Sequence, residues 1–125
     1  MSTMEQVEEN LASAESSAIG LLSEDDLSTL NGVREAFEQL RPIPCTSCEY
    51  CMPCPSGVKI PWNLNLYNKG YMYNTMELQK SQYNKADEAD RASECTACLE
   101  CEEKCPQNIK ISEWMTCIGS TFAET

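Results

Sequence analysis

The apolar and polar positions of the chain follow helical spacing in its N-terminal third. Across residues 4–18 apolar side chains recur at steps of three and four, and glutamates occupy the opposite face. A second pattern starts after Ser23, which is suited to cap a helix whose first turn is acidic, and it ends before Pro42. We therefore predict two amphipathic helices, and each apolar stripe needs a partner surface.

The remaining segments also predict helices and no strand. Pro61 is well placed at a first helical position, and we expect that helix to end or bend at Gly70. A further helix is predicted for residues 71–82, followed by a solvated helix or loop over residues 84–93. Because no stretch alternates as a strand would, the chain is predicted to be all-α.

A last helix is predicted after the extended residues 107–111. Ser112 is a good N-cap, and an apolar stripe follows it that we expect to pack over the cysteine-rich segments described next. The stripe consists of Ile111, Trp114, Met115, Ile118 and Phe122. Tyr50, Trp62, Tyr67 and Tyr71 are candidates to line the same region, although ordinary core packing is the simpler interpretation of all four.

Eight of the nine cysteines fall in two matched runs. Each run has three cysteines at three-residue steps, then a fourth that is followed at once by proline. Three thiolates from one loop can converge on one iron–sulfur cubane, but the fourth must come from elsewhere. In two-cluster ferredoxins the fourth cysteine of each run binds the other run's cluster.

The pattern therefore predicts two [4Fe-4S] clusters with crossed ligation. The first would be held by Cys45, Cys48, Cys51 and Cys105, and the second by Cys95, Cys98, Cys101 and Cys54. The roughly forty residues between the two runs are predicted to be helical, whereas small bacterial ferredoxins place such loops on β-hairpins. We expect an α-helical ferredoxin-like domain, preceded by the two amphipathic helices.

Zinc is the main alternative to iron and sulfide. Four-cysteine zinc sites also use closely spaced pairs, so the eight thiolates would suit a zinc-stabilised interaction domain without a redox role. A disulfide scaffold is disfavoured because the sequence shows no secretory signal and its cysteines are concentrated in two motifs. The ninth cysteine, Cys117, lies in the last predicted helix, where we expect a buried apolar role.

The net charge of the chain limits the kinds of molecule that it is expected to bind. The formal net charge of the 125 residues is -11, which argues against nucleic acid and anionic membrane surfaces and suits docking on a basic redox partner. Simple solubility would explain the same charge. No apolar stretch reaches membrane-spanning length, so a cytoplasmic location is expected. The absence of histidine removes His-based catalysis and Rieske-type clusters.

Three stretches resemble the C-terminal ferredoxin-type region of the iron–sulfur aldo/keto reductases. They run over residues 43–61, 65–68 and 101–109, and include the shortened Cys-Met-Pro-Cys-Pro ending of the first run. Residues 1–10 resemble the start of the last barrel helix of these enzymes, and residues 23–27 resemble the helix that follows.

The resemblance implies a division into residues 1–41, corresponding to the last barrel helices, and residues 42–125, the two-cluster domain. It also implies that the rest of the barrel, with its catalytic residues and most of its NADP site, is not in this chain. Ser2, Gln6 and Asn10 would correspond to one wall of the adenosine site. We expect an electron-transfer module or fragment that is not catalytic alone, with an aldo/keto reductase barrel or another redox protein as its partner.

Overall fold

The computed structural model describes residues 2–123, and within them every regular element is helical. The α-helices are α1 (Met4–Ser16), α2 (Glu24–Leu40), α3 (Ile60–Met72), α4 (Met76–Lys85), α5 (Glu100–Glu103) and α6 (Ile111–Phe122). Two short 3-10 turns, η1 (Glu88–Asp90) and η2 (Ala92–Glu94), lead into the second cysteine run. The all-α prediction is confirmed. None of these helices is both long and apolar enough to cross a membrane.

The chain divides after Ala36 into two compact units, which we describe separately. The first unit contains α1 and most of α2. Thr3 caps α1, because its hydroxyl accepts a hydrogen bond from the Gln6 N–H at 3.3 Å. Ser23 caps α2 in a reciprocal box, in which Asp26 N–H donates to the Ser23 hydroxyl and Ser23 N–H donates to the Asp26 carboxylate. No side chain of α1 or α2 is buried.

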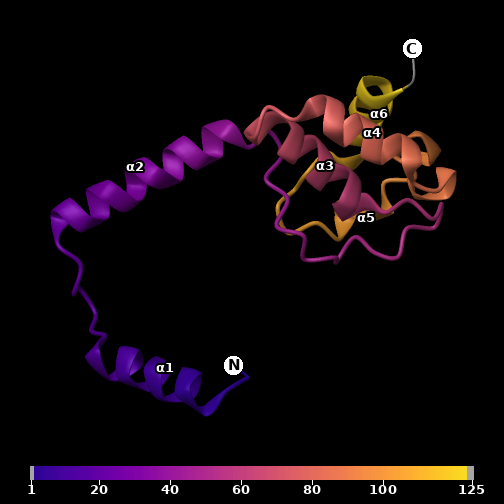
Figure 1. Ribbon diagram of the computed structural model, residues 1–125. Coiled ribbons are helices and arrows are strands. Elements are labelled where there is room, and N and C mark those ends of the chain that lie inside the picture. The colour runs from indigo at the N-terminus through magenta and orange to yellow at the C-terminus, as the bar shows by residue number, and fades with distance from the viewer. Residues whose placement is uncertain (1, 124–125) are drawn as a thin grey trace. The chain divides into compact units, whose positions relative to one another are not determined.

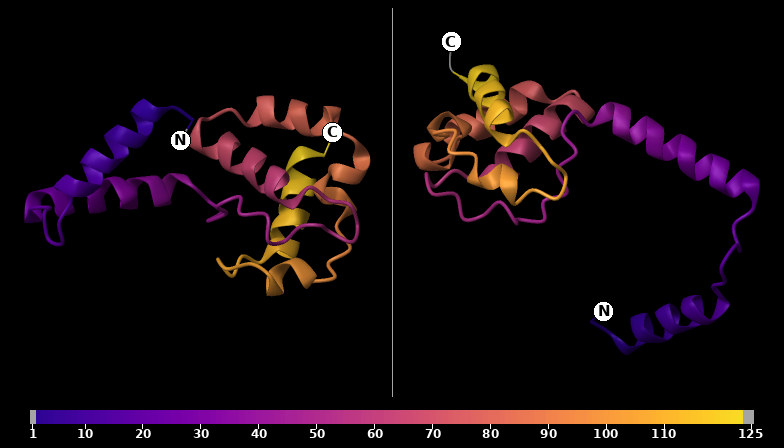
Figure 2. Two further views of the ribbon diagram at one scale, coloured as in Figure 1. Left: turned by 90° about the horizontal axis from the view of Figure 1, so that it is seen from below. Right: turned by 180° about the vertical axis from the view of Figure 1, so that it is seen from behind.

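The second unit is built on the packing of α3, α4 and α6 (Figure 1). Its centre is an aromatic group in which Tyr67 lies 5.5 Å from Trp114 and 6.3 Å from Phe122, measured between ring centroids. Tyr83 of α4 completes it, 5.2 Å from Phe122. Figure 2 shows the two cysteine-bearing segments, magenta and orange, beside α3 and α6. The three helices thus form the scaffold on which both segments are mounted.

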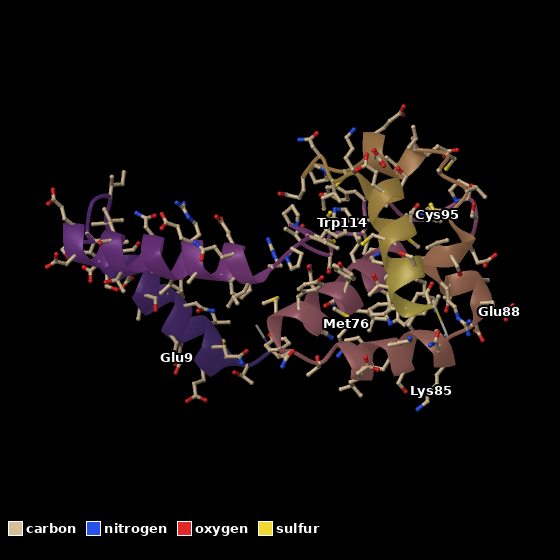
Figure 3. The ribbon with its side chains drawn as sticks, turned by 90° about the horizontal axis from the view of Figure 1, so that it is seen from above. Glu9, Met76, Lys85, Glu88, Cys95 and Trp114 are labelled. Carbon is tan, nitrogen blue, oxygen red and sulfur yellow. The ribbon has the colours of Figure 1, made fainter. Side chains whose placement is uncertain are left out.

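Gly70 does not end or bend a helix as predicted. Helix α3 continues through it to Met72, and the chain turns only at residues 73–75. The reason is a close approach between helices. A Cβ at Gly70 would lie 2.8 Å from the Met76 sulfur, at the start of α4 (Figure 3). The glycine therefore serves helix packing rather than helix termination.

Ser112 is not the N-cap of the last helix, which begins one residue earlier at Ile111. The cap comes instead from Glu102 of α5, whose carboxylate accepts hydrogen bonds from the Ser112 N–H at 2.9 Å and the Ser112 hydroxyl at 2.6 Å. These bonds, with the nearby Lys110 ammonium, lower the pKa of Glu102. An ionised carboxylate at this position complements the helix dipole and ties the second cysteine run to α6.

Candidate metal centres

Two cavities in the second unit are each lined by four cysteines. The first is lined by Cys45, Cys48 and Cys51 of the first run together with Cys105 of the second. The second cavity is lined by Cys95, Cys98 and Cys101 of the second run together with Cys54 of the first. Each cavity thus takes three thiols from one run and one from the other, which is the grouping that the crossed prediction requires.

The two cysteine loops share an unusual backbone. The residues on either side of the middle cysteine adopt left-handed φ angles, 55° at Ser47 and 64° at Glu49 in the first loop. The matching residues of the second loop, Ala97 and Leu99, have φ angles of 54° and 67°. This conformation costs roughly 1–2 kcal/mol at each non-glycine residue. Turns of this kind gather backbone N–H groups into anion-binding concavities such as those around iron–sulfur clusters.

The segments after the fourth cysteines repeat one another. Cys54-Pro-Ser-Gly-Val-Lys-Ile60 corresponds to Cys105-Pro-Gln-Asn-Ile-Lys-Ile111, and each segment ends at the first residue of a helix, α3 or α6. The turns match as well, with left-handed φ angles of 84° at Gly57 and 51° at Asn108. This repeat was not predicted from the sequence, although its Cys-Pro start and its Lys-Ile end are present there. It gives the two cavities equivalent walls.

Those walls are largely apolar. Leu64, Ile109 and Ile111 contribute to the first cavity, and Val58 and Ile60 contribute to the second. Of the predicted apolar stripe of α6, only Ile111 lines one of the two cysteine cavities. None of the four aromatic candidates lines either cysteine cavity. Core packing is confirmed for Trp62 and Tyr67 but was wrong for Tyr50 and Tyr71, whose side chains are exposed. An apolar wall restricts water around a cluster and so affects its potential.

The thiols influence one another's ionisation. Burial raises the pKa of Cys51, and the thiolates of Cys45, Cys105 and Cys48 raise it further. Burial likewise raises the pKa of Cys101 to about 11, with added repulsion from Cys95 and Cys98. Four thiolates therefore repel one another unless a cationic core lies among them. This donor set fits a [4Fe-4S] cluster, whose binding releases the thiol protons.

Two buried asparagines of α3 fix where the cysteine loops begin. Asn68 accepts a hydrogen bond from the Ile43 N–H at 3.0 Å and donates to the Ile43 carbonyl at 2.8 Å, two residues before Cys45. Asn63 donates to the Asp90 carbonyl at 2.8 Å and accepts from the Ala92 N–H at 3.1 Å, shortly before Cys95. The sequence analysis did not assign either side chain a role in the site.

Cys117 lies apart from both cavities. Its side chain is half-buried, packs against the core and has its sulfur 3.6 Å from the Tyr67 hydroxyl. The structure therefore places it in the packed helix α6, away from the residues that line the cavities, and it is less buried than predicted.

A family model described as a 4Fe-4S dicluster domain matches residues 44–110, more than half of the chain. The chain belongs to the 4Fe-4S dicluster domain family. All eight cysteines of the two cavities fall inside the matched residues, and the chain has two [4Fe-4S] clusters. Comparison with curated proteins and with solved structures gave no match.

We expect Asn68→Ala and Asn63→Ala to weaken the two cluster sites separately. Each substitution leaves buried backbone groups unpaired, at about 1–3 kcal/mol for each group. Asn68→Ala should speed loss of iron from the first site and Asn63→Ala from the second. The measurement is the bleaching rate of visible cluster absorbance in the presence of an iron chelator, with EPR spectra of the remaining clusters. Asn65→Ala, an exposed position on the same helix, is the control, and an equal effect there would contradict the assignment.

Proposed function

We propose that this dicluster domain transfers electrons through its two clusters. The observation that carries the proposal is the exchange of fourth cysteines, since Cys105 lines the first cavity and Cys54 lines the second. Covalent crossing between the runs keeps two redox sites within one small unit. A bound [4Fe-4S] cluster supplies reversible one-electron chemistry, with potentials that span roughly −700 to +450 mV across proteins.

Different residues of the chain bind the clusters, restrict water around them and leave one edge of each site open to a partner. The thiolates of both runs bind iron, and the left-handed turns gather N–H groups around them. One such group is observed directly, since the Ser47 N–H lies 3.5 Å from the Cys45 sulfur. The apolar walls limit water on the inner side. Cys48 and Cys98 are exposed, so each site has an edge that a partner protein can approach.

We further propose that the chain is the C-terminal module or a fragment of an aldo/keto reductase-like oxidoreductase. The support is the resemblance over residues 1–10, 23–27, 43–61, 65–68 and 101–109, together with two helices whose apolar side chains are not buried. The exposed fractions are 55% at Leu30 and 64% at Val33 on α2. A barrel would cover these side chains, or a separate redox protein would dock on the acidic surface. A cytoplasmic location fits the free thiols.

Zinc remains the second candidate because cysteine is its usual structural ligand. The family match weighs against it, because the model of a 4Fe-4S dicluster domain covers residues 44–110 and with them all eight cysteines of the two cavities.

Metal analysis of the protein purified without oxygen tests the proposal directly. We expect about eight irons and eight acid-labile sulfides for each chain, the content of two four-iron clusters. Reduction with dithionite should give EPR signals that show magnetic coupling, because the clusters share one unit. Two zinc ions with no sulfide would overturn the redox function and leave a structural domain.

If the ligation is crossed, a substitution of the fourth cysteine of one run should remove the cluster that the other run holds. Cys54→Ser should remove chiefly the second cluster, so about four irons should remain for each chain. Its EPR spectrum should match that of Cys98→Ser and differ from that of Cys48→Ser. Cys117→Ser is the matched control and should keep both clusters. If Cys54→Ser instead matched Cys48→Ser, each run would bind its own cluster.

The proposed barrel partner predicts association through α2. Size-exclusion chromatography with light scattering, run without oxygen, should show self-association or a bound partner, because the apolar stripe is otherwise in water. A double variant, Leu30→Ser with Val33→Ser, should elute as a monomer with its iron content unchanged. A wild-type chain that stays monomeric and alone at all concentrations would count against this context.

A further inference from the structure

A third cavity, distinct from the two cluster sites, adjoins the first of them. It has a volume of about 170 Å³, well above the share of roughly 30 Å³ that one water occupies in the liquid. Its lining is rich in hydrogen-bond donors and contains no carboxylate. The lining residues are Arg41, Cys45, Ser47, Asn65, Asn68, Lys69, Met72 and Tyr73, and we call this cavity the Arg41–Lys69 pocket.

Two of the nine cations of this acidic chain line the pocket together. Only nine lysines and arginines accompany twenty acidic residues. Elsewhere Lys59 pairs with Asp90 at 2.7 Å, and Lys110 lies 3.7 Å from Glu102. Arg41 and Lys69 form no ion pair with any residue of the described range 2–123. Two positive side chains therefore share one concave surface without an internal counter-charge.

Neither cation is needed to bind the carbonyl groups at the C-terminal end of α3. Lysine near a helix C-terminus often offsets the free carbonyls there. Here the Lys69 carbonyl accepts hydrogen bonds from the Tyr73 N–H and the Thr75 hydroxyl, and the Gly70 carbonyl accepts from the Thr75 N–H at 3.0 Å. Within residues 2–123 the structure gives neither cation a hydrogen bond to the backbone. The Arg41 guanidinium lies over the Phe37 ring, 5.7 Å from its centroid, so its charge has no anionic partner.

We propose that the Arg41–Lys69 pocket binds a small carboxylate anion. The planar guanidinium of Arg41 matches a carboxylate with two parallel hydrogen bonds, and the Lys69 ammonium supplies a second charge. Asn65 and Tyr73 also line the pocket, and both residues carry uncharged hydrogen-bond donors. The Asn68 amide is already occupied, because it bonds both backbone groups of Ile43, and so it shapes the pocket without binding the ligand.

The pocket shares one residue with the first cluster site, since Cys45 lines both. Resting on the proposed electron-transfer function, this adjacency couples the ligand to the redox state. Reduction adds one electron to the first cluster and brings a negative charge beside the bound carboxylate. The anion then binds the reduced protein more weakly, and by reciprocity it lowers the reduction potential of that cluster.

The binding test uses succinate and the oxidised, cluster-loaded chain in isothermal titration calorimetry without oxygen. We expect saturable binding that Arg41→Gln and Lys69→Gln each weaken at least about tenfold, because each removes a charge-assisted hydrogen bond. Lys85→Gln makes the same change in net charge at the opposite end of α4 from Met76, outside the pocket lining, and should leave the affinity unchanged (Figure 3).

Three results would overturn the site. They are no saturable binding, an equal loss in Lys85→Gln, and full displacement of succinate by chloride at matched ionic strength. Iron content and circular dichroism of each variant verify the fold. If Arg41→Gln fails to fold, Arg41→Lys replaces it, and its loss of the planar fork should still weaken binding. Calorimetry requires no redox activity. If the metal analysis finds zinc and no sulfide, the same titration is run on the zinc-loaded chain, so it tests the site even if the electron-transfer function is rejected.

The coupling has its own measurement, a dithionite titration followed by EPR with and without saturating succinate. One of the two midpoint potentials should fall, and the Lys69→Gln variant should abolish the difference. A tenfold weaker affinity in the reduced state corresponds to a fall of about 59 mV for a one-electron couple. Unchanged potentials in the presence of bound succinate would overturn the coupling.

Discussion

The second unit depends on one constraint, which is that each four-cysteine cavity is lined by residues of both cysteine runs. Cys45 and Cys105 line the same cavity although sixty positions separate them in the chain. The two runs must therefore be held at a set distance and angle before either site is complete. The core of α3, α4 and α6 provides that frame. Each bound cluster would in turn link the two cysteine runs. Folding and metal binding are linked for this reason.

Helix α3 provides most of the contacts that hold the two cysteine runs in place. It begins where the first run's closing segment ends, and its apolar side contributes Leu64 to the first cavity. Its two buried asparagines bind the backbone that enters each cysteine run. Since buried polar groups require partners, these amides also fix the register of chain segments that have no regular structure of their own. One helix thus determines the position of both sites.

The two sites are equivalent in backbone but differ in their surroundings. The left-handed position after the middle cysteine is Glu49 in the first loop and Leu99 in the second. The first cavity also adjoins the Arg41–Lys69 pocket, whereas the second lies beside α5, whose Glu102 caps α6. Net charge around a cluster sets its potential, so this chain gives its two clusters different electrostatic environments.

The sequence by itself determined the helical class and the two cysteine runs, because helix periodicity, Cys-Pro endings and three-residue steps are local signals. The tertiary structure decided what depends on distant partners. Gly70 was expected to end a helix, but Met76 packs against it. Ser112 was expected to cap a helix, but Glu102 of another helix takes that role. The buried asparagines and the cationic pocket are likewise formed by residues far apart in the chain, and spacing along a sequence does not show which side chains meet.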